Sequence, residues 1–114
     1  MNDKVQNLTE DQLQEKLAKS PAPRVTEDTI DARIANTDYI KIGTKTVHCT
    51  IKLDNGFEVY AQSSAVNAEN FDFEIGKTYA YRKAYQQLWD FFGLLLAEKQ
   101  YQNSRPAAIS SAAA

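Results

Sequence analysis

The feature that most constrains the fold is a strict alternation of apolar and polar side chains in the middle of the chain. From Thr46 to Leu53 every second residue is apolar, and the alternation resumes after the turn sequence Asp54-Asn55-Gly56 and continues to Ala61. Alternation of this kind predicts strands with one buried face, and two such runs around a short turn predict a β-hairpin. Another layer of the chain must therefore cover the apolar face.

The length of the turn decides the register of this hairpin. A two-residue Asn-Gly loop would place Leu53 opposite Glu58, so that an apolar and a charged side chain share a face. A three-residue loop, Asp54-Asn55-Gly56, instead places Leu53 opposite Phe57, with Gly56 in the left-handed conformation. We predict the three-residue loop, because it gathers all the apolar side chains of both strands on one face: Val47, Cys49, Ile51, Leu53, Phe57, Val59 and Ala61.

Two further elements complete an α+β fold. Tyr39–Ile42 predicts a third, edge strand, joined to the hairpin through the turn at residues 43–45. Residues from about 72 to 99 predict one long helix that covers the sheet. Gly76 and Gly93 each lower its helix propensity by roughly 1 kcal/mol relative to alanine, so each predicts a close backbone approach or a bend. The predicted apolar arc of the helix consists of Tyr81, Ala84, Tyr85, Leu88, Trp89, Phe92, Leu95 and Leu96.

Two short helices are predicted before the sheet. Thr9 caps the first, with Gln12 closing a capping box and a Leu8–Leu13 staple, and the prolines of residues 20–23 end it. Because its apolar stripe is thin, we expect a weakly docked arm. The second helix is capped by Thr26, stapled by Val25 and Ile30, and extends to about Ala35, with Ile30, Ile34 and the stem of Arg33 at the core.

These elements suggest a division of the chain into three parts. Residues 1–23 form a helical arm and linker, residues 24–101 form a single α+β domain, and residues 102–114 form a disordered tail without a core-forming pattern. A chain of 114 residues with 43% hydrophobic residues fits one such domain.

Composition restricts the classes of partner and the compartment. The net charge of −2 is too balanced for the broad electrostatic field of a general nucleic-acid binder. The polar start lacks a secretion signal, and the lone cysteine, Cys49, has no internal disulfide partner, so we expect a reducing cytoplasm. The longest apolar stretch, residues 88–97, is interrupted by Asp90 and is too short to span a bilayer.

No arrangement of side chains indicates catalysis, a metal site or a cofactor. His48 and Cys49 are neighbours on a strand and point to opposite faces, so they form no dyad. Ser63-Ser64 lacks a second histidine and a nucleophile elbow, and one histidine and one cysteine are too few for a structural zinc site. Glu69, Asp72 and Glu74 could hold a cation or form an acid–base pair, but interaction with the helix dipole is the simpler interpretation.

Two surfaces are candidates for binding. Leu94 lies on the polar side of the long helix, with Phe91 at its margin and Glu98 one turn further, which suggests contact with a partner protein or with a second copy of the chain. The alternative is a nucleic-acid site at Tyr79, Arg82 and Lys83, where basic and aromatic residues are interleaved.

The chain also resembles a family of small tailed-phage proteins that is catalogued by phage gene numbers, as gp forty-nine of one phage and gene sixty-six of another. The resemblance covers roughly residues 25–96, and its marker residues include Asn55, Gly56, Phe57, Ser64, Asn70, Phe71, Gly76 and Trp89. It implies a phage or prophage origin and action inside an infected bacterium, and it carries no assigned reaction. Most of these positions suit structural roles, such as capping of the long helix by Asn70.

The sequence therefore favours a non-catalytic phage accessory protein that binds a host or phage protein in the host cytoplasm, for example to inhibit a host process or defence. Nucleic-acid or nucleotide binding is the alternative. An enzyme would require an acid pair among Glu69, Asp72 and Glu74.

Overall fold

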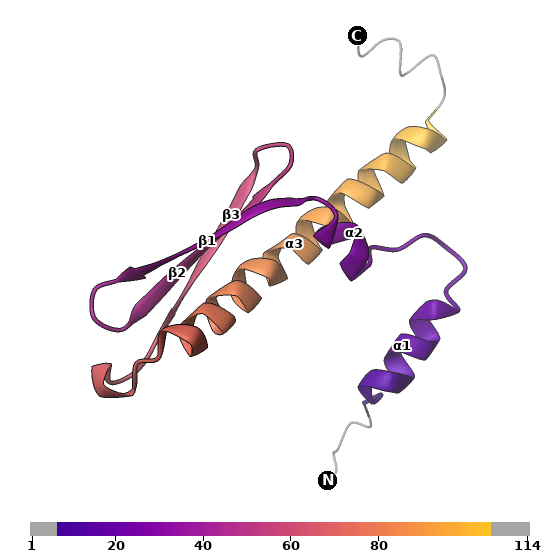
Figure 1. The fold of residues 1–114 in the computed structure, drawn as a ribbon. Coiled ribbons are helices and arrows are strands. Elements are labelled where there is room, and N and C mark those ends of the chain that lie inside the picture. Colours follow the sequence, from indigo (N-terminus) through magenta and orange to yellow (C-terminus); the bar gives the residue numbers. More distant parts are fainter. Residues whose placement is uncertain (1–6, 106–114) are drawn as a thin grey trace.

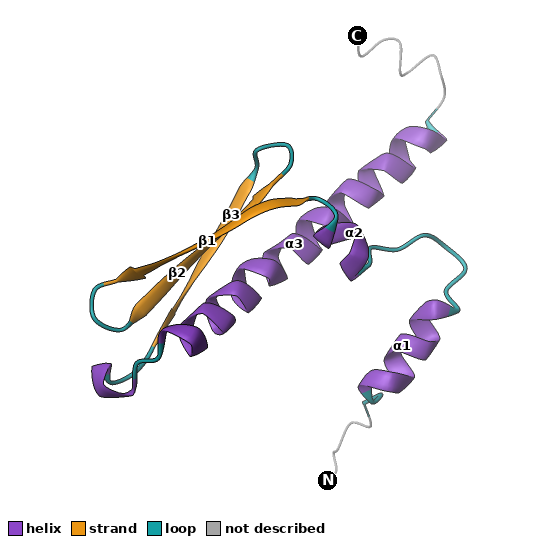
Figure 2. Ribbon diagram, in the orientation of Figure 1, coloured by secondary structure: helices purple, strands orange, loops and turns teal. Residues whose placement is uncertain are grey.

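A computed structural model describes residues 7–105 and confirms the α+β class. Three antiparallel strands form a sheet in the order β1-β2-β3, and the long helix α3 runs along one face of it (Figures 1 and 2). The elements in chain order are α1 (Glu10–Ala18), α2 (Glu27–Asp31), β1 (Ile34–Ile42), β2 (Thr46–Leu53), β3 (Glu58–Ser64), the 3-10 helix η1 (Ala68–Asn70) and α3 (Phe73–Ser104).

The predicted register of the hairpin is confirmed. Lys52 pairs with Glu58, and the backbone N–H of Leu53 donates to the carbonyl of Phe57 over 2.8 Å, so the three-residue loop closes the turn. Gly56 has a φ of +92°, in the left-handed region that suits glycine. The apolar face of this hairpin consequently turns toward α3.

The second helix is shorter than predicted. α2 ends at Asp31 rather than near Ala35, and β1 begins at Ile34, which makes this strand longer than the predicted edge strand. Ile34 pairs with Leu53 of the central strand, and the register shifts just after it. The spacing of Ile30 and Ile34 suits a helix face, but pairing with β2 supplies strand hydrogen bonds that a local pattern does not reveal.

The core lies between the sheet and α3. Residues at intervals of four along α3 are buried in it: Gly76, Ala80, Ala84, Leu88 and Phe92. An alanine Cβ at Gly76 would lie 2.5 Å from Cγ2 of Val47, so the predicted close approach is confirmed there, whereas Gly93 has nothing within 4 Å of such an atom. The predicted burial of Leu95 is wrong, because its side chain is 51% exposed.

Both ends of α3 differ from the predictions. Asp72, not Asn70, is the N-cap, and its carboxylate accepts hydrogen bonds from the N–H groups of Glu74 and Ile75. The helix continues to Ser104 instead of ending near residue 99, so the first residues of the predicted tail are helical. The remainder of that predicted tail, residues 106–114, lies outside the described residues.

The helix α1 forms as predicted but contributes nothing to the core. Its capping box is present, with Gln12 N–H donating to the Thr9 hydroxyl and Thr9 N–H donating to the Gln12 side chain. No α1 residue is buried, and Figure 1 shows α1 standing away from the sheet. No helix within residues 7–105 combines the length and apolar composition that a membrane span requires.

Candidate partner-binding surface

The helix α3 continues past the end of the sheet. Phe92 is its last buried residue within the described part of the chain, and about a third of the helix follows it. Figure 1 shows this C-terminal part projecting beyond the hairpin of β2 and β3. Because the sheet no longer covers α3 there, apolar side chains on this part of the helix are exposed.

Four exposed apolar residues lie where α3 leaves the sheet. Phe57, at the end of the hairpin, contacts the ring of Phe91 edge-on, with 5.3 Å between the ring centroids. Leu94 and Leu95 follow Phe91 at the helical spacings i+3 and i+4, which places them on the same side of the helix. All four residues are exposed: Phe57 by 48%, Phe91 by 39%, Leu94 by 65% and Leu95 by 51%. We call these four residues the Phe91 surface.

Glu98 lies one turn beyond Leu94 and Leu95, at the polar margin of the Phe91 surface. Its carboxylate accepts a hydrogen bond of 2.6 Å from the side-chain amide of Gln102. The structure thus brings the three predicted binding residues, Phe91, Leu94 and Glu98, onto one side of α3.

Sequence reasoning missed two residues of this surface. The sequence pattern predicts that Phe57 and Leu95 are both in the core, because each continues an apolar pattern that is buried elsewhere in its element. The position of Phe57 directly after a turn was the available signal, since a side chain at the tip of a hairpin projects past the end of the strands. For Leu95 no local signal exists, because its exposure depends on where the sheet ends.

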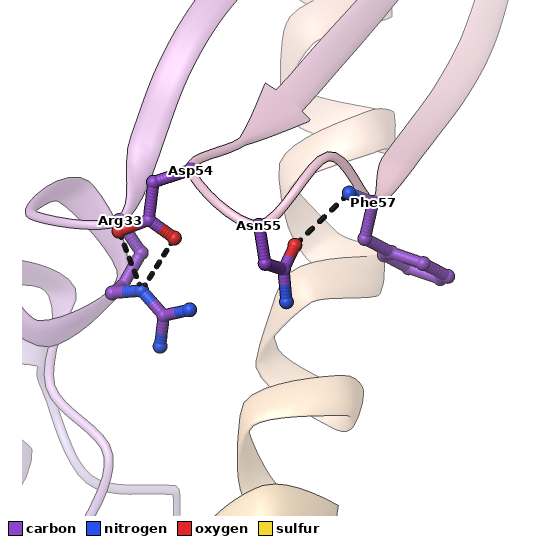
Figure 3. A network of polar contacts seen from close by, with 4 residues as sticks. All are labelled: Arg33, Asp54, Asn55 and Phe57. Carbon is purple, nitrogen blue, oxygen red and sulfur yellow. Dashed lines mark hydrogen bonds and ion pairs between the residues drawn. The ribbon is translucent and has the colours of Figure 1, made fainter.

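Polar contacts within the turn hold Phe57 in place (Figure 3). The side-chain oxygen of Asn55 accepts a hydrogen bond of 2.9 Å from the backbone N–H of Phe57. On the other side of the turn, Nε of Arg33 lies 2.8 Å from one carboxylate oxygen of Asp54 and 2.9 Å from the other. The backbone N–H of Asp54 also donates to the carbonyl of Arg33, so the tip of the hairpin is tied to the start of β1.

Several of the remaining marker residues gather at the opposite end of the sheet. Ser64, Asn70, Phe71 and Gly76 line a small cleft of about 190 Å³ between β3 and α3. The hydroxyls of Ser64 and Thr46 are 2.7 Å apart, which joins two paired strands. This hydrogen bond gives the Ser64 side chain a structural role in joining β2 and β3.

Residues 25–100 match the family described as "Phage protein (N4 Gp49/phage Sf6 gene 66) family". This chain belongs to that family. The match begins at Val25, so α1 and the linker lie outside it, as the sequence resemblance indicated. No curated protein and no solved structure matches the chain.

In this member of the gp49/gene 66 family, the basic residues of the alternative nucleic-acid site, Arg82 and Lys83, have different partners. Arg82 lies over the ring of Tyr79, 5.7 Å from its centroid, and both side chains are exposed. Lys83 is turned toward the sheet instead, and its ammonium donates to the carbonyl of Gln62 over 3.2 Å. Gln87 donates similarly to the carbonyl of Tyr60, so Lys83 and Gln87 cover part of the open edge of β3.

Two of the acidic residues near the start of α3, Asp72 and Glu74, make structural contacts. Asp72 caps the helix, and Glu74 forms an ion pair of 3.5 Å with Lys77. Glu69 lies in η1. Within residues 7–105 no group of three or more histidine, cysteine or acidic side chains is placed to hold a metal ion.

His48 and Cys49 point to opposite faces of the sheet, as predicted. The ring of His48 stacks on Tyr60 with 5.5 Å between centroids, on the face away from α3. Cys49 is fully buried, and this burial, with a smaller effect from the charge of Asp38, raises the pKa of its thiol to about 11. Because the thiol stays protonated at neutral pH, Cys49 behaves as a small apolar side chain of the core.

Proposed function

We propose that this chain is a non-catalytic phage protein that acts by binding a protein of the host or of the phage through the Phe91 surface. The observation that carries the proposal is the exposure of four adjacent apolar side chains where α3 leaves the sheet. Exposed apolar patches of this kind are typical of protein-binding sites. Burying one leucine or phenylalanine in a partner contributes roughly 1.5–3 kcal/mol, so a few such side chains suffice for a specific contact.

The composition of the surface supports a protein as the ligand. α3 and the tip of the hairpin both contribute apolar side chains, and polar contacts hold the tip at Phe57. An aromatic pair beside two leucines offers the large apolar contacts that anchor protein interfaces. The polar margin at Glu98 suits the rim of such an interface. We also propose that the protein acts in the cytoplasm of the infected bacterium, for example by inhibiting a host process or defence.

Substitution of Leu94 tests the proposal. A tagged chain is used to capture proteins from infected and uninfected bacterial lysates at low and high salt, with nuclease treatment. We expect Leu94→Glu to lose the specific partner, because a carboxylate would be buried in an apolar contact. With the purified partner, the affinity of Leu94→Glu should fall by about tenfold or more, given the burial energy of a leucine.

Val66→Glu is the matched control. Val66 is 87% exposed in the loop after β3, outside the Phe91 surface, so it should retain the partner. Retention of every partner and of the parent's oligomeric state by Leu94→Glu would contradict the proposal. Capture that vanishes with nuclease or at high salt would favour the nucleic-acid alternative at Tyr79, Arg82 and Lys83.

A further inference from the structure

A second concave site lies between α1 and the paired helices α2 and α3. Its volume is about 1190 Å³, and Leu17 and Val25 contribute to its lining. One wall is a row of three aromatic residues at intervals of four along α3: Tyr81, Tyr85 and Trp89. The ring centroids of Tyr81 and Tyr85 are 5.6 Å apart and those of Tyr85 and Trp89 are 6.4 Å apart, so the three rings form a continuous surface.

Carboxylates surround this aromatic wall. Asp31 of α2 accepts a hydrogen bond of 2.7 Å from the hydroxyl of Tyr85, and Glu27, Asp28 and Glu10 also line the cleft. Burial, the hydrogen bond to Asp31 and the negative charges of Asp31 and Glu27 all raise the pKa of Tyr85. No ion pair within residues 7–105 involves any of the four carboxylates. The aromatic wall therefore lies among negatively charged side chains.

Two arginines, Arg24 and Arg82, also line the cleft. Nε of Arg24 donates to the carbonyl of Leu17 over 3.1 Å. The guanidinium of Arg82 lies over Tyr79, which is not part of the lining. The lining therefore carries four carboxylates and two guanidiniums, a net formal charge of −2.

We propose that this cleft binds a basic segment of a partner protein and receives an arginine or lysine side chain against the aromatic wall. The face of an aromatic ring attracts a cation, and tryptophan does so most strongly. The carboxylates at the rim add charge complementarity for the same side chain. A phosphate backbone would be repelled by these carboxylates, and a purely apolar segment would leave them without partners.

The site is separate from the Phe91 surface. At 3.6 residues per turn, the stripe of Tyr81, Tyr85 and Trp89 points roughly a third of a turn away from the stripe of Phe91 and Leu95. The inference therefore does not depend on the proposed function, and the two can be tested independently.

The single tryptophan of the chain, Trp89, reports on this cleft by its fluorescence. The probe is a short capped peptide in which arginine alternates with alanine, compared with the same peptide carrying glutamine in place of arginine. We expect a saturable change in Trp89 emission with the arginine peptide. The double substitution Glu27→Gln with Asp31→Asn should weaken binding by about tenfold, the effect expected for the loss of two charge contacts at a partly exposed site.

Asp38→Asn with Glu58→Gln is the matched control, because it removes the same charge from the sheet face opposite α3. It should leave the affinity for the arginine peptide within about twofold of the parent. Equal weakening by both double variants would overturn the proposal, since only net charge would then matter. Equal binding of the arginine and glutamine peptides would overturn it as well.

Circular dichroism of each variant establishes that the fold is intact before binding is compared. Leu94→Glu should bind the arginine peptide like the parent. Loss of peptide binding in Leu94→Glu would contradict the separation of the two sites, whereas failure of the peptide to bind the parent would overturn the cleft proposal alone and leave the Phe91 surface in place.

Discussion

At the scale of single residues, two glycines of α3 show that the effect of a residue depends on what packs against it. Gly76 and Gly93 have the same intrinsic effect on a helix, yet only Gly76 lies against another element. An added Cβ at Gly76 would meet Val47 of the central strand, while the same atom at Gly93 would meet open space. Gly76 therefore allows α3 to approach the sheet closely, and Gly93 only lowers the helix propensity.

Alanine at each position should have opposite effects on stability. Gly93→Ala should raise the free energy of unfolding by about 0.5–1 kcal/mol through helix propensity. Gly76→Ala should lower it by about 1 kcal/mol or more, because overpacking against Val47 outweighs the propensity gain. Urea unfolding of both variants measures these changes. An equal increase in both would show that α3 can shift away from the sheet at little cost.

At the scale of elements, the start of α3 depends on one side chain. The carboxylate of Asp72 accepts hydrogen bonds from two N–H groups of the first turn, 2.9 Å and 3.2 Å long. These groups have no partner within the helix, so the cap fixes where α3 begins. The start of α3 in turn determines which residues face the sheet and which reach the Phe91 surface.

Removal of this cap should destabilise the protein measurably. Asp72→Ala should lower the free energy of unfolding by about 1 kcal/mol, while Asp72→Asn should keep most of the stability, because asparagine also caps helices well. Glu69→Ala is the control, since it removes a nearby acidic residue that is not the cap of α3. Thermal or urea unfolding is the measurement. Equal stability of Asp72→Ala and Glu69→Ala would contradict the capping role.

At the scale of the whole molecule, the chain is extended rather than spherical. Its radius of gyration is 19.3 Å, whereas a compact domain of 100 residues has one of about 13 Å. The projecting end of α3 and the separate α1 account for this difference, as Figure 1 shows. Both proposed binding sites lie beside these extended parts.

Removal of the arm tests whether the body is independent of it. A chain that begins at Arg24 should unfold with a free energy within about 0.5 kcal/mol of that of the parent, because no α1 side chain is buried. Urea unfolding of the truncated and full chains is the comparison. A loss of more than about 1 kcal/mol would show that α1 packs on the body in solution.

The hairpin and the long helix could be predicted because their signals are local. The alternation of apolar residues and the three-residue turn Asp54-Asn55-Gly56 specify β2 and β3 and their register. The capping box of α1 and the Thr26 cap are equally local, since each involves residues three positions apart. The end of α2 could not be placed in this way, because the pairing of Ile34 with Leu53 spans distant parts of the chain.

The same distinction between local signals and long-range contacts applies to the candidate sites. An apolar residue on the polar side of α3 identified Leu94 from the sequence, and the structure finds it 65% exposed. Phe57 and Leu95 belong to the Phe91 surface because the sheet ends beside them, and the local sequence pattern does not show where the sheet ends. The sequence pattern predicts that Tyr81, Tyr85 and Trp89 belong to the core arc, and all three pack against the core. Their partial exposure to a cleft depends on how α1 and α2 lie beside α3.

The sequence by itself determined the β2–β3 hairpin, its register and the face of β2 that is buried, because these follow from interactions between residues close in the chain. Only the tertiary structure decided where along α3 the apolar side chains cease to be buried. The sheet ends at the tip of the hairpin while α3 continues to Ser104, so Leu95, which belongs to the predicted apolar arc, is exposed. Periodicity gives the direction of a side chain, but whether another element covers it depends on contacts between distant parts of the chain.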